Sequence, residues 1–223
     1  MAAELLQSAP EDLDIIDGEI GKSRQSSGPS ISVAEIARHL LPSSRTRGDR
    51  EPGLAGEGWF FSDHMNYPYG VHVAVVRIDR DTGHAEVERY LVAYDIGRAV
   101  NPMLVQGQIA GGFAQGIGGA LFEEFTYDER GEPMNVTFAD YLMPTAREVP
   151  ALDVMICEDA PSPLNPLGLK GAGEGGTNAV GAAVASAIDD ALQMPGAVTR
   201  LPVTPQRLKE IIDRMGSASR LFG

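Results

Sequence analysis

Residues 163–178 read Pro-Leu-Asn-Pro-Leu-Gly-Leu-Lys-Gly-Ala-Gly-Glu-Gly-Gly-Thr-Asn, so that one carboxylate, Glu174, stands among two prolines and five glycines. Apolar residues recur every four positions in the alanine-rich segment 179–192, which predicts a helix. Gly176 or Thr177 could cap that helix and place Glu174 at or just ahead of its N-terminus, where negative charge is favoured. Neighbouring glycines would let another molecule approach the backbone closely. The pattern suits a general base, although an exposed helix-capping acid is the commoner explanation for one such residue.

The overall composition excludes several classes of function. The chain has 223 residues, of which 43% are hydrophobic and 22% charged, as in ordinary globular proteins. A net charge of −13 argues against a nucleic-acid partner or an anionic membrane surface. Without a long apolar run or a signal-like N-terminus, we expect a cytoplasmic protein with no membrane span. Because Cys157 is the only cysteine, this chain alone cannot form a disulfide, a thiolate zinc site or an iron–sulfur cluster.

A second glycine-rich segment, residues 103–124, is predicted to form one long helix. It contains six glycines, each costing about 0.8–1 kcal/mol relative to alanine in a helix interior. Its apolar positions share one face, which we expect to pack on a core: Ile109, Phe113, Ile117 and Leu121. Gln108 and Gln115 lie on the opposite side among glycines. That bare face suits either close packing of another helix, which is the commoner case, or a flat polar ligand.

The remaining pattern predicts an α+β fold, a two-layer sandwich of antiparallel or mixed strands and helices. We expect one domain over residues 1–223, with a peripheral strand–helix–loop region at 1–58 and a core at 59–215. The peripheral region should hold a hairpin turning at Asp17-Gly18, a polar loop at 21–29, a helix at 33–41 capped by Ser32 and Glu35, and a surface loop at 43–58. The core should hold strands at 59–61, 71–79, 84–94 and 152–158, and a helix from Thr204-Pro205 to about Met215.

Other chemical motifs find little support. Residues 171–176 match the dinucleotide pattern G-x-G-x-x-G, but we reject that reading because no βαβ unit surrounds them and a carboxylate inside the loop would repel pyrophosphate. Lys170 precedes the glycines instead of closing them, so the loop is not a P-loop. The four histidines lack metal-ligand spacing, and His72 is expected simply to point from a strand. The pair Glu123-Glu124 is expected to be solvated, and no G-x-S-x-G motif indicates a serine hydrolase.

Three segments together resemble a known family. They are Asp-Ile-Gly-Arg-Ala-Val-Asn-Pro at 95–102, Gly-Gln-Ile-Ala-Gly-Gly-Phe-Ala-Gln-Gly-Ile-Gly at 107–118, and Asn-Pro-Leu-Gly-Leu-Lys-Gly-Ala-Gly-Glu at 165–174. The order and spacing of these segments resemble those in the xanthine dehydrogenase, aldehyde oxidase and aerobic carbon monoxide dehydrogenase family. The similarity is to the C-terminal portion of the family's molybdenum-cofactor-binding large subunit, and it extends from about Leu5 to Ile212. The bacterial carbon monoxide dehydrogenase-like subunits are the most similar in character.

This resemblance implies roles for particular residues. Glu174 falls on the family's catalytic glutamate, which takes a proton from a molybdenum-bound hydroxide so that water-derived oxygen can attack an electron-poor carbon. Gln108, beside Gly107, falls on the glutamine that hydrogen-bonds the cofactor, and the backbone at Ala172 and Gly173 lies against its metal end. The implied cofactor is molybdenum–molybdopterin in its cytosine dinucleotide form. Electrons would leave for iron–sulfur clusters and FAD on partner subunits, and no residue of this chain is expected to ligate the metal.

The chain departs from the family in length, since the family's large subunit is several times longer. We therefore expect either a split subunit or a truncated product, inactive alone, that works with a longer half carrying the missing N-terminal domains, an iron–sulfur subunit and an FAD subunit. Its substrate would be an aldehyde, an N-heterocycle, a purine or carbon monoxide. The alternatives are a non-catalytic structural partner that keeps the fold without the cofactor and a stand-alone nucleotide-binding module.

Overall fold

The computed structural model describes residues 1–22 and 28–221, with side chains described up to Arg214 in the last helix. The chain forms two compact units, Met1–Phe61 and Ser62–Gly223. Each unit has its own hydrophobic core.

The first unit is a small sheet with a helix. Strands β1 (Leu13–Ile16), β2 (Glu19–Lys22) and β3 (Ser30–Ser32) pair antiparallel in that order. The predicted hairpin turn is confirmed at Asp17-Gly18, where both residues have positive φ, as a tight two-residue turn requires. The centre of the predicted polar loop, residues 23–27, lies outside the described residues. The unit also contains α1 (Ala2–Leu5), η1 (Pro10–Asp12), α2 (Val33–His39) and η2 (Arg45–Arg47).

The predicted capping of α2 is confirmed. The Ser32 hydroxyl accepts a hydrogen bond of 3.0 Å from the backbone N–H of Glu35, which satisfies one of the free donors at the helix start. The helix then packs on the sheet through buried residues of the described part of this unit: Ile20, Ile31, Ile36 and Leu40.

The second unit contains a mixed sheet. Strands β4 (Tyr69–Asp79) and β5 (His84–Asp95) form the predicted antiparallel hairpin, and β6 (Leu152–Cys157) pairs parallel with β5. A bulge between Val75 and Val76 shifts the register of the hairpin. The sheet order is therefore β4-β5-β6, and the long connection from β5 to β6 carries the first large helix.

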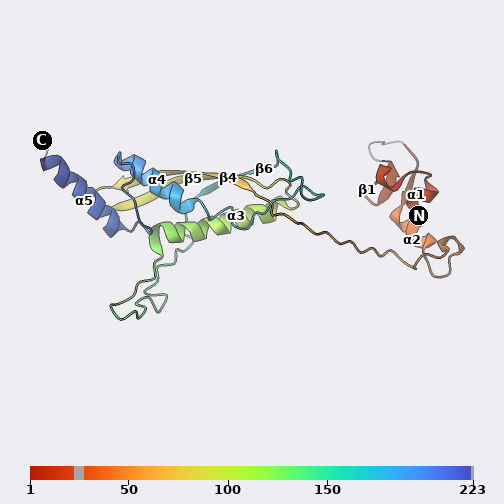
Figure 1. The fold of residues 1–223 in the computed structure, drawn as a ribbon, viewed down its shortest axis with the longest axis horizontal. Helices are drawn as coiled ribbons and strands as arrows, with labels where there is room; N and C mark the ends of the chain where they lie inside the picture. The colour runs from red at the N-terminus through yellow and green to blue at the C-terminus, as the bar shows by residue number, and fades with distance from the viewer. Residues whose placement is uncertain (23–27, 222–223) are drawn as a thin grey trace. The chain divides into compact units, whose positions relative to one another are not determined.

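Two helices cover one face of this sheet. α3 (Pro102–Ile117) and α4 (Val180–Leu192) lie along it in Figure 1, and their apolar faces meet the inward side chains of β5. The residues with almost no exposure include Tyr90, Val92, Ile109, Phe113, Ile117, Val180, Val184 and Ile188. The predicted two-layer α+β fold is confirmed.

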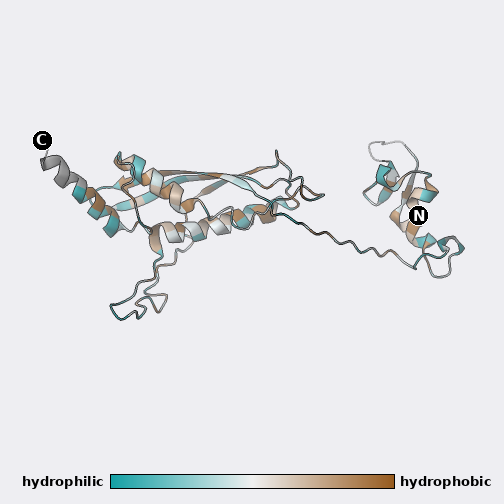
Figure 2. Cartoon of the chain, in the orientation of Figure 1, coloured by the Kyte–Doolittle hydropathy of each residue, from teal (hydrophilic) through white to brown (hydrophobic). Residues whose placement is uncertain are grey.

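The last helix, α5 (Pro205–Leu221), begins as predicted. The backbone N–H of Arg207 donates to the Thr204 hydroxyl at 3.3 Å, and Pro205 takes the first helical position. The coloured part of α5 in Figure 2 carries both hydrophobic and hydrophilic residues, and Leu208 is buried in the core. The helix runs beyond the predicted end at Met215.

Two predicted elements are wrong in detail. Trp59, Phe60 and Phe61 are 78%, 57% and 80% exposed and form no strand, because no neighbouring strand pairs with them. The helix predicted at 103–124 is α-helical only to Ile117 and ends in a π-turn, η3 (Gly118–Phe122). Two successive glycines at 118–119 supply the backbone freedom that this wider turn needs.

Candidate active site

Glu174 lies in the loop that joins β6 to α4. Neither predicted cap is found, because α4 starts at Val180 without a side-chain cap. Instead, the backbone N–H groups of Thr177 and Asn178 donate to the Glu174 carbonyl oxygen at 3.0 and 3.2 Å. Glu174 thus lies in a turn ahead of the helix, which begins at Val180. The helix dipole acts within the first turn, so it contributes less to this carboxylate than the sequence suggests.

The Glu174 side chain is exposed and lines an open cleft of about 480 Å³. One wall of the cleft is the glycine-rich loop and the other is the segment that leads into β4. The lining residues include Met65, Asn66, Tyr67, Gly70, His72, Tyr94, Gly173 and Asn178. The carboxylate is therefore open to a small molecule.

Lys170 anchors the loop ahead of Glu174. Its ammonium group lies 3.1 Å from Asp95 at the end of β5 and 5.0 Å from the centre of the Tyr69 ring, and its side chain is only 7% exposed. The backbone N–H of Gly97, at 2.7 Å, and then Lys170 hold the pKa of Asp95 below its ordinary value. Lys170 is thus part of an ion pair that holds the start of the glycine-rich loop.

His72 anchors the loop after Glu174. Its Nε2 atom lies 2.9 Å from the Gly175 carbonyl oxygen, and its Nδ1 atom lies 3.0 Å from the Tyr90 hydroxyl. Burial lowers the pKa of His72. The expectation that His72 simply points from a strand therefore missed both contacts. The signal was present, because His72 precedes Ala74 and Val76 on the inward side of β4.

Tyr94 was not predicted as a site residue. A Cβ atom on Gly70 or on Gly175 would overlap its ring, so both glycines are needed for the close approach. Its hydroxyl donates to the Gly171 carbonyl oxygen at 3.4 Å. Burial, and then the charge of Glu174, raise the pKa of Tyr94, which remains a neutral donor in this cleft.

The glycines of α3 divide between the two roles that the sequence left open. A Cβ on Gly112 would crowd the backbone of Gly176, and one on Gly116 would overlap Val180, so these two glycines serve packing. Gly107 and Gly111 have open space beside them, and Gln108 is exposed.

The predicted site residues are only partly brought together. Gly173 and Glu174 line the same cleft, whereas Ala172 packs its side chain on the core and offers a ligand only its backbone. Gly107 and Gln108 are not among the described residues that line this cleft. Their helix reaches the loop where the carbonyl oxygen of Ile109 lies against Gly176.

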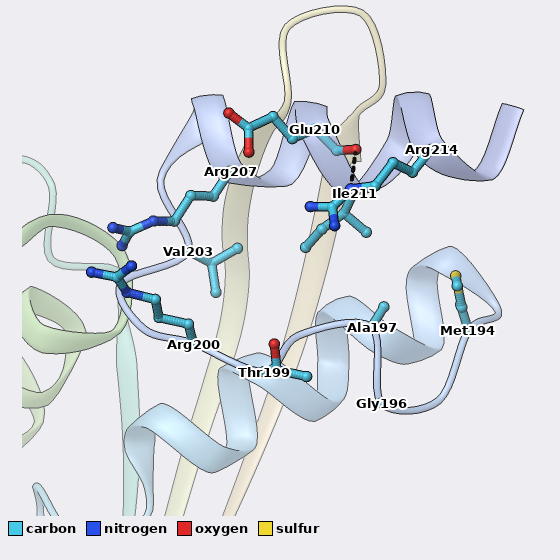
Figure 3. Close-up of a pocket in the computed structure, with 10 residues that line it drawn as sticks. All are labelled: Met194, Gly196, Ala197, Thr199, Arg200, Val203, Arg207, Glu210, Ile211 and Arg214. Carbon is cyan, nitrogen blue, oxygen red and sulfur yellow. Dashed lines mark hydrogen bonds between the residues drawn. The ribbon is translucent and has the colours of Figure 1, made fainter. Parts of the chain in front are cut away.

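A second cleft, between α5 and the α4–α5 connection, is rich in arginine (Figure 3). Two of its guanidinium groups bind Glu124, two residues after η3: Arg200 at 2.6 Å and Arg207 at 2.7 Å. Arg207, and then Arg200, lower the pKa of Glu124. Glu124 was expected to be solvated, but its side chain is only 20% exposed. Its ion pair with Arg207 links α5 to the segment that follows η3. These arginines are therefore engaged in holding the fold.

Within residues 1–22 and 28–221, no group of three or more His, Cys, Asp and Glu side chains could hold a metal ion. None of the helices in the described part of the chain has the length and apolar content needed to cross a membrane.

Comparison with known proteins identifies the family. The sequence model of the molybdopterin cofactor-binding domain matches residues 1–150. The chain is 42% identical to the 6-hydroxypseudooxynicotine dehydrogenase complex subunit gamma of Paenarthrobacter nicotinovorans, over 99% of this chain and 28% of that protein. It is 37% identical to the nicotine 6-hydroxylase large subunit of the same organism, over 97% of this chain and 27% of that one. The fold matches carbon monoxide dehydrogenase from Oligotropha carboxidovorans with a TM-score of 0.81 and 29% identity, over 97% of this chain and 27% of that chain.

The chain belongs to the molybdopterin cofactor-binding domain family. It spans a little over a quarter of the length of these relatives. The matched residues 1–150 include Gln108 but not Glu174, so the role of Glu174 depends on the geometry of its cleft.

Proposed function

We propose that this chain is the base-bearing portion of a multi-subunit molybdenum hydroxylase and that Glu174 is its general base. The observation that carries this proposal is the position of the carboxylate. Glu174 is exposed in an open cleft while the backbone on either side is fixed by Lys170 and His72. A general base needs both access to the proton it removes and a defined position relative to it.

The glycine-rich loop that lines the cleft and the exposed face of α3, which lies outside it, each fit part of a flat, polar cofactor. A Cβ on Gly171, Gly173 or Gly107 would meet open space, so the backbone is bare beside Glu174 and beside Gln108. Bare backbone and an exposed carboxamide offer both donors and acceptors. We propose that Gln108, Gly107, Ala172 and Gly173 bind molybdopterin, in its cytosine dinucleotide form. When bound, the cofactor supplies two-electron oxidation chemistry, which no side chain of this protein provides.

Glu174 then accepts a proton from the water that becomes the incoming oxygen. Its carboxylate lines the same cleft as Tyr94, whose hydroxyl stays protonated because burial, and then the charge of Glu174, raise its pKa. The product is a hydroxylated aldehyde or N-heterocycle carbon. An N-heterocycle is the first substrate to test, since both sequence relatives are named for nicotine-type compounds.

The proposed partners are a longer half of the molybdenum subunit, an iron–sulfur subunit and an FAD subunit. The face of the sheet opposite α3 and α4 supports the longer half as a partner. Val71, Val73 and Val75 on β4 and Met155 on β6 are 63%, 48%, 46% and 55% exposed. Contiguous exposed apolar surface of this kind marks an interaction site.

Reconstitution tests the proposal. The chain is co-expressed with the longer half and the two electron-transfer subunits, and dye-linked oxidation of an N-heterocycle is measured. Glu174→Gln should lower kcat by about 10²–10⁴-fold, the range for loss of a general base. Glu129→Gln, which removes an exposed carboxylate in the 127–133 turn, is the matched control and should leave kcat unchanged.

The same experiment separates the rival functions. A complex in which Glu174→Gln is as active as the wild type removes Glu174 as the base. A complex that forms without molybdenum and without turnover supports a non-catalytic structural partner. Calorimetric binding of NAD or ATP by the chain alone would support a nucleotide-binding module.

A further inference from the structure

The loop around Glu174 contains glycine at positions 171, 173, 175 and 176, which allow many backbone conformations. A base on such a loop would be poorly positioned unless other groups fixed the backbone. The nearest fixed point after Glu174 is the carbonyl oxygen of Gly175, which lies 2.9 Å from His72 Nε2 on β4. These two residues are 103 positions apart in the sequence.

The partners of His72 determine where its hydrogen lies. A carbonyl oxygen only accepts hydrogen bonds, so Nε2 must carry the hydrogen that reaches Gly175. Burial favours the neutral ring, and in a neutral ring with hydrogen on Nε2 the Nδ1 atom is a bare acceptor. The Tyr90 hydroxyl, 3.0 Å from Nδ1, must then donate. Because burial also raises the pKa of Tyr90, that hydroxyl keeps its proton.

Tyr90 extends this chain of contacts into the core. It is 1% exposed, and its ring lies edge-on to His72 and packs on Phe113 of α3 with a centroid distance of 4.5 Å. The hydroxyl is therefore held by packing on the same helix that carries Gln108. One continuous set of contacts runs from α3 through β5 and β4 to the Glu174 loop.

We propose that His72 is the positioning residue for Glu174, acting as a neutral Nε2–H imidazole that accepts a hydrogen bond from Tyr90 and donates one to the Gly175 carbonyl oxygen. His72 fixes the peptide one residue beyond Glu174 and needs no contact with substrate or cofactor. The catalytic consequence rests on the proposed function of Glu174. The tautomer of His72 and its restraint on the loop do not depend on that proposed function.

The tautomer is measured directly by long-range ¹H–¹⁵N NMR of the full chain labelled with ¹⁵N-histidine. His72→Gln assigns its signals among the four histidines. We expect a protonated Nε2 and an unprotonated Nδ1 at neutral pH. In Tyr90→Phe, which keeps the ring packing, the preference for this tautomer should weaken. A wild-type ring with hydrogen on Nδ1, or one averaging both tautomers, would overturn the proposal.

Backbone amide exchange measures the restraint on the loop. The amides of Thr177 and Asn178, which donate to the Glu174 carbonyl oxygen, report on it. In His72→Leu they should exchange roughly five- to tenfold faster, as expected for the loss of one typical hydrogen bond. His72→Gln keeps a donor near the Nε2 position and should restore most of the protection. His84→Gln, at an exposed histidine of β5, should change nothing. Equal exchange rates in His72→Leu and wild type contradict the restraint, and if His72→Leu does not fold, the tautomer in wild type and Tyr90→Phe decides.

In the reconstituted complex, His72→Leu should lower kcat with little change in KM, and His72→Gln should recover part of it. This result and the NMR results are separable. If Glu174→Gln retained full turnover, the proposed base would be wrong while the His72 tautomer and exchange data still stood. If the tautomer were wrong while Glu174→Gln lost turnover, only the positioning role would fall.

Discussion

Glu174 is one exposed carboxylate whose neighbours are held by side chains distant in sequence. Lys170 pairs with Asp95, 75 residues away, and Gly171 accepts from Tyr94, 77 residues away. His72 binds Gly175 on the other side. At the residue scale, the site is therefore an accessible acid on a backbone fixed at both ends, which is the arrangement that positioned acid–base chemistry requires.

His72 gives this region a pH dependence. Its pKa is lowered by burial from the ordinary value of 6.5, so the unfolded chain takes up the proton first as pH falls. The stabilising contribution is present above pH 6.5 and is lost as pH falls through the lower pKa of the folded state. The titratable groups around His72 are Tyr90, its partner, and Tyr67, Tyr94 and Glu174, which line the same cleft.

We therefore predict that the free energy of unfolding decreases as the pH falls below 6.5, and that His72→Gln removes part of this decrease. Denaturant titrations at several pH values measure it. His84→Gln, at the exposed histidine, should retain the wild-type slope. An unchanged slope in His72→Gln would show that burial does not disfavour the charged ring.

At the scale of elements, the loop and α3 meet backbone to backbone. A Cβ on Gly176 would overlap the carbonyl oxygen of Ile109, whereas one on Gly173 would meet nothing within 4 Å. Gly176→Ala should thus destabilise the chain by about 1–3 kcal/mol, the usual cost of overpacking. Gly173→Ala is the matched control and should leave the melting temperature unchanged. Equal melting temperatures for the two variants would contradict this packing.

Periodicity predicted most elements but not the contacts that build the site. Local spacing of residues in the sequence was enough to predict the buried faces of α3 and α4, the β4–β5 hairpin and the Thr204 cap. The prediction of a strand at 59–61 was wrong because these three aromatic residues show no polar–apolar alternation and have no partner strand. The capping of α4 failed because the turn uses the main-chain oxygen of Glu174, which no side-chain pattern reveals.

The sequence predicted the acidic residue of the site but not the side chains that hold its loop in place. Glu174 and its glycines are contiguous in sequence and belong to one of the three segments that resemble the family. Tyr94 and His72 contact the loop only after the sheet has formed, so their roles depend on strand register. The inward position of His72 on β4 was the one available signal.

At the scale of the whole molecule, this chain spans a little over a quarter of its relatives and leaves an apolar sheet face exposed. We predict that this face binds the longer half of the molybdenum subunit. Val73→Glu should abolish co-purification of the two, since it would bury an unpaired charge in the contact. Arg80→Gln, at the hairpin tip, changes the net charge equally and should bind normally.

Light scattering and circular dichroism of Val73→Glu alone must show the fold of the wild-type chain. Normal co-purification of a folded Val73→Glu would contradict the assigned face. Wild-type dimers that Val73→Glu dissociates would assign the face to a second copy instead.

The most direct measurement is the single-turnover reduction of the reconstituted enzyme by substrate, with wild type and Glu174→Gln matched in molybdenum content. This measurement isolates the chemical step from electron transfer and product release. We predict that Glu174→Gln binds substrate with nearly unchanged affinity and is reduced at least about 100-fold more slowly. Reduction at the wild-type rate in a fully loaded Glu174→Gln enzyme would contradict the account.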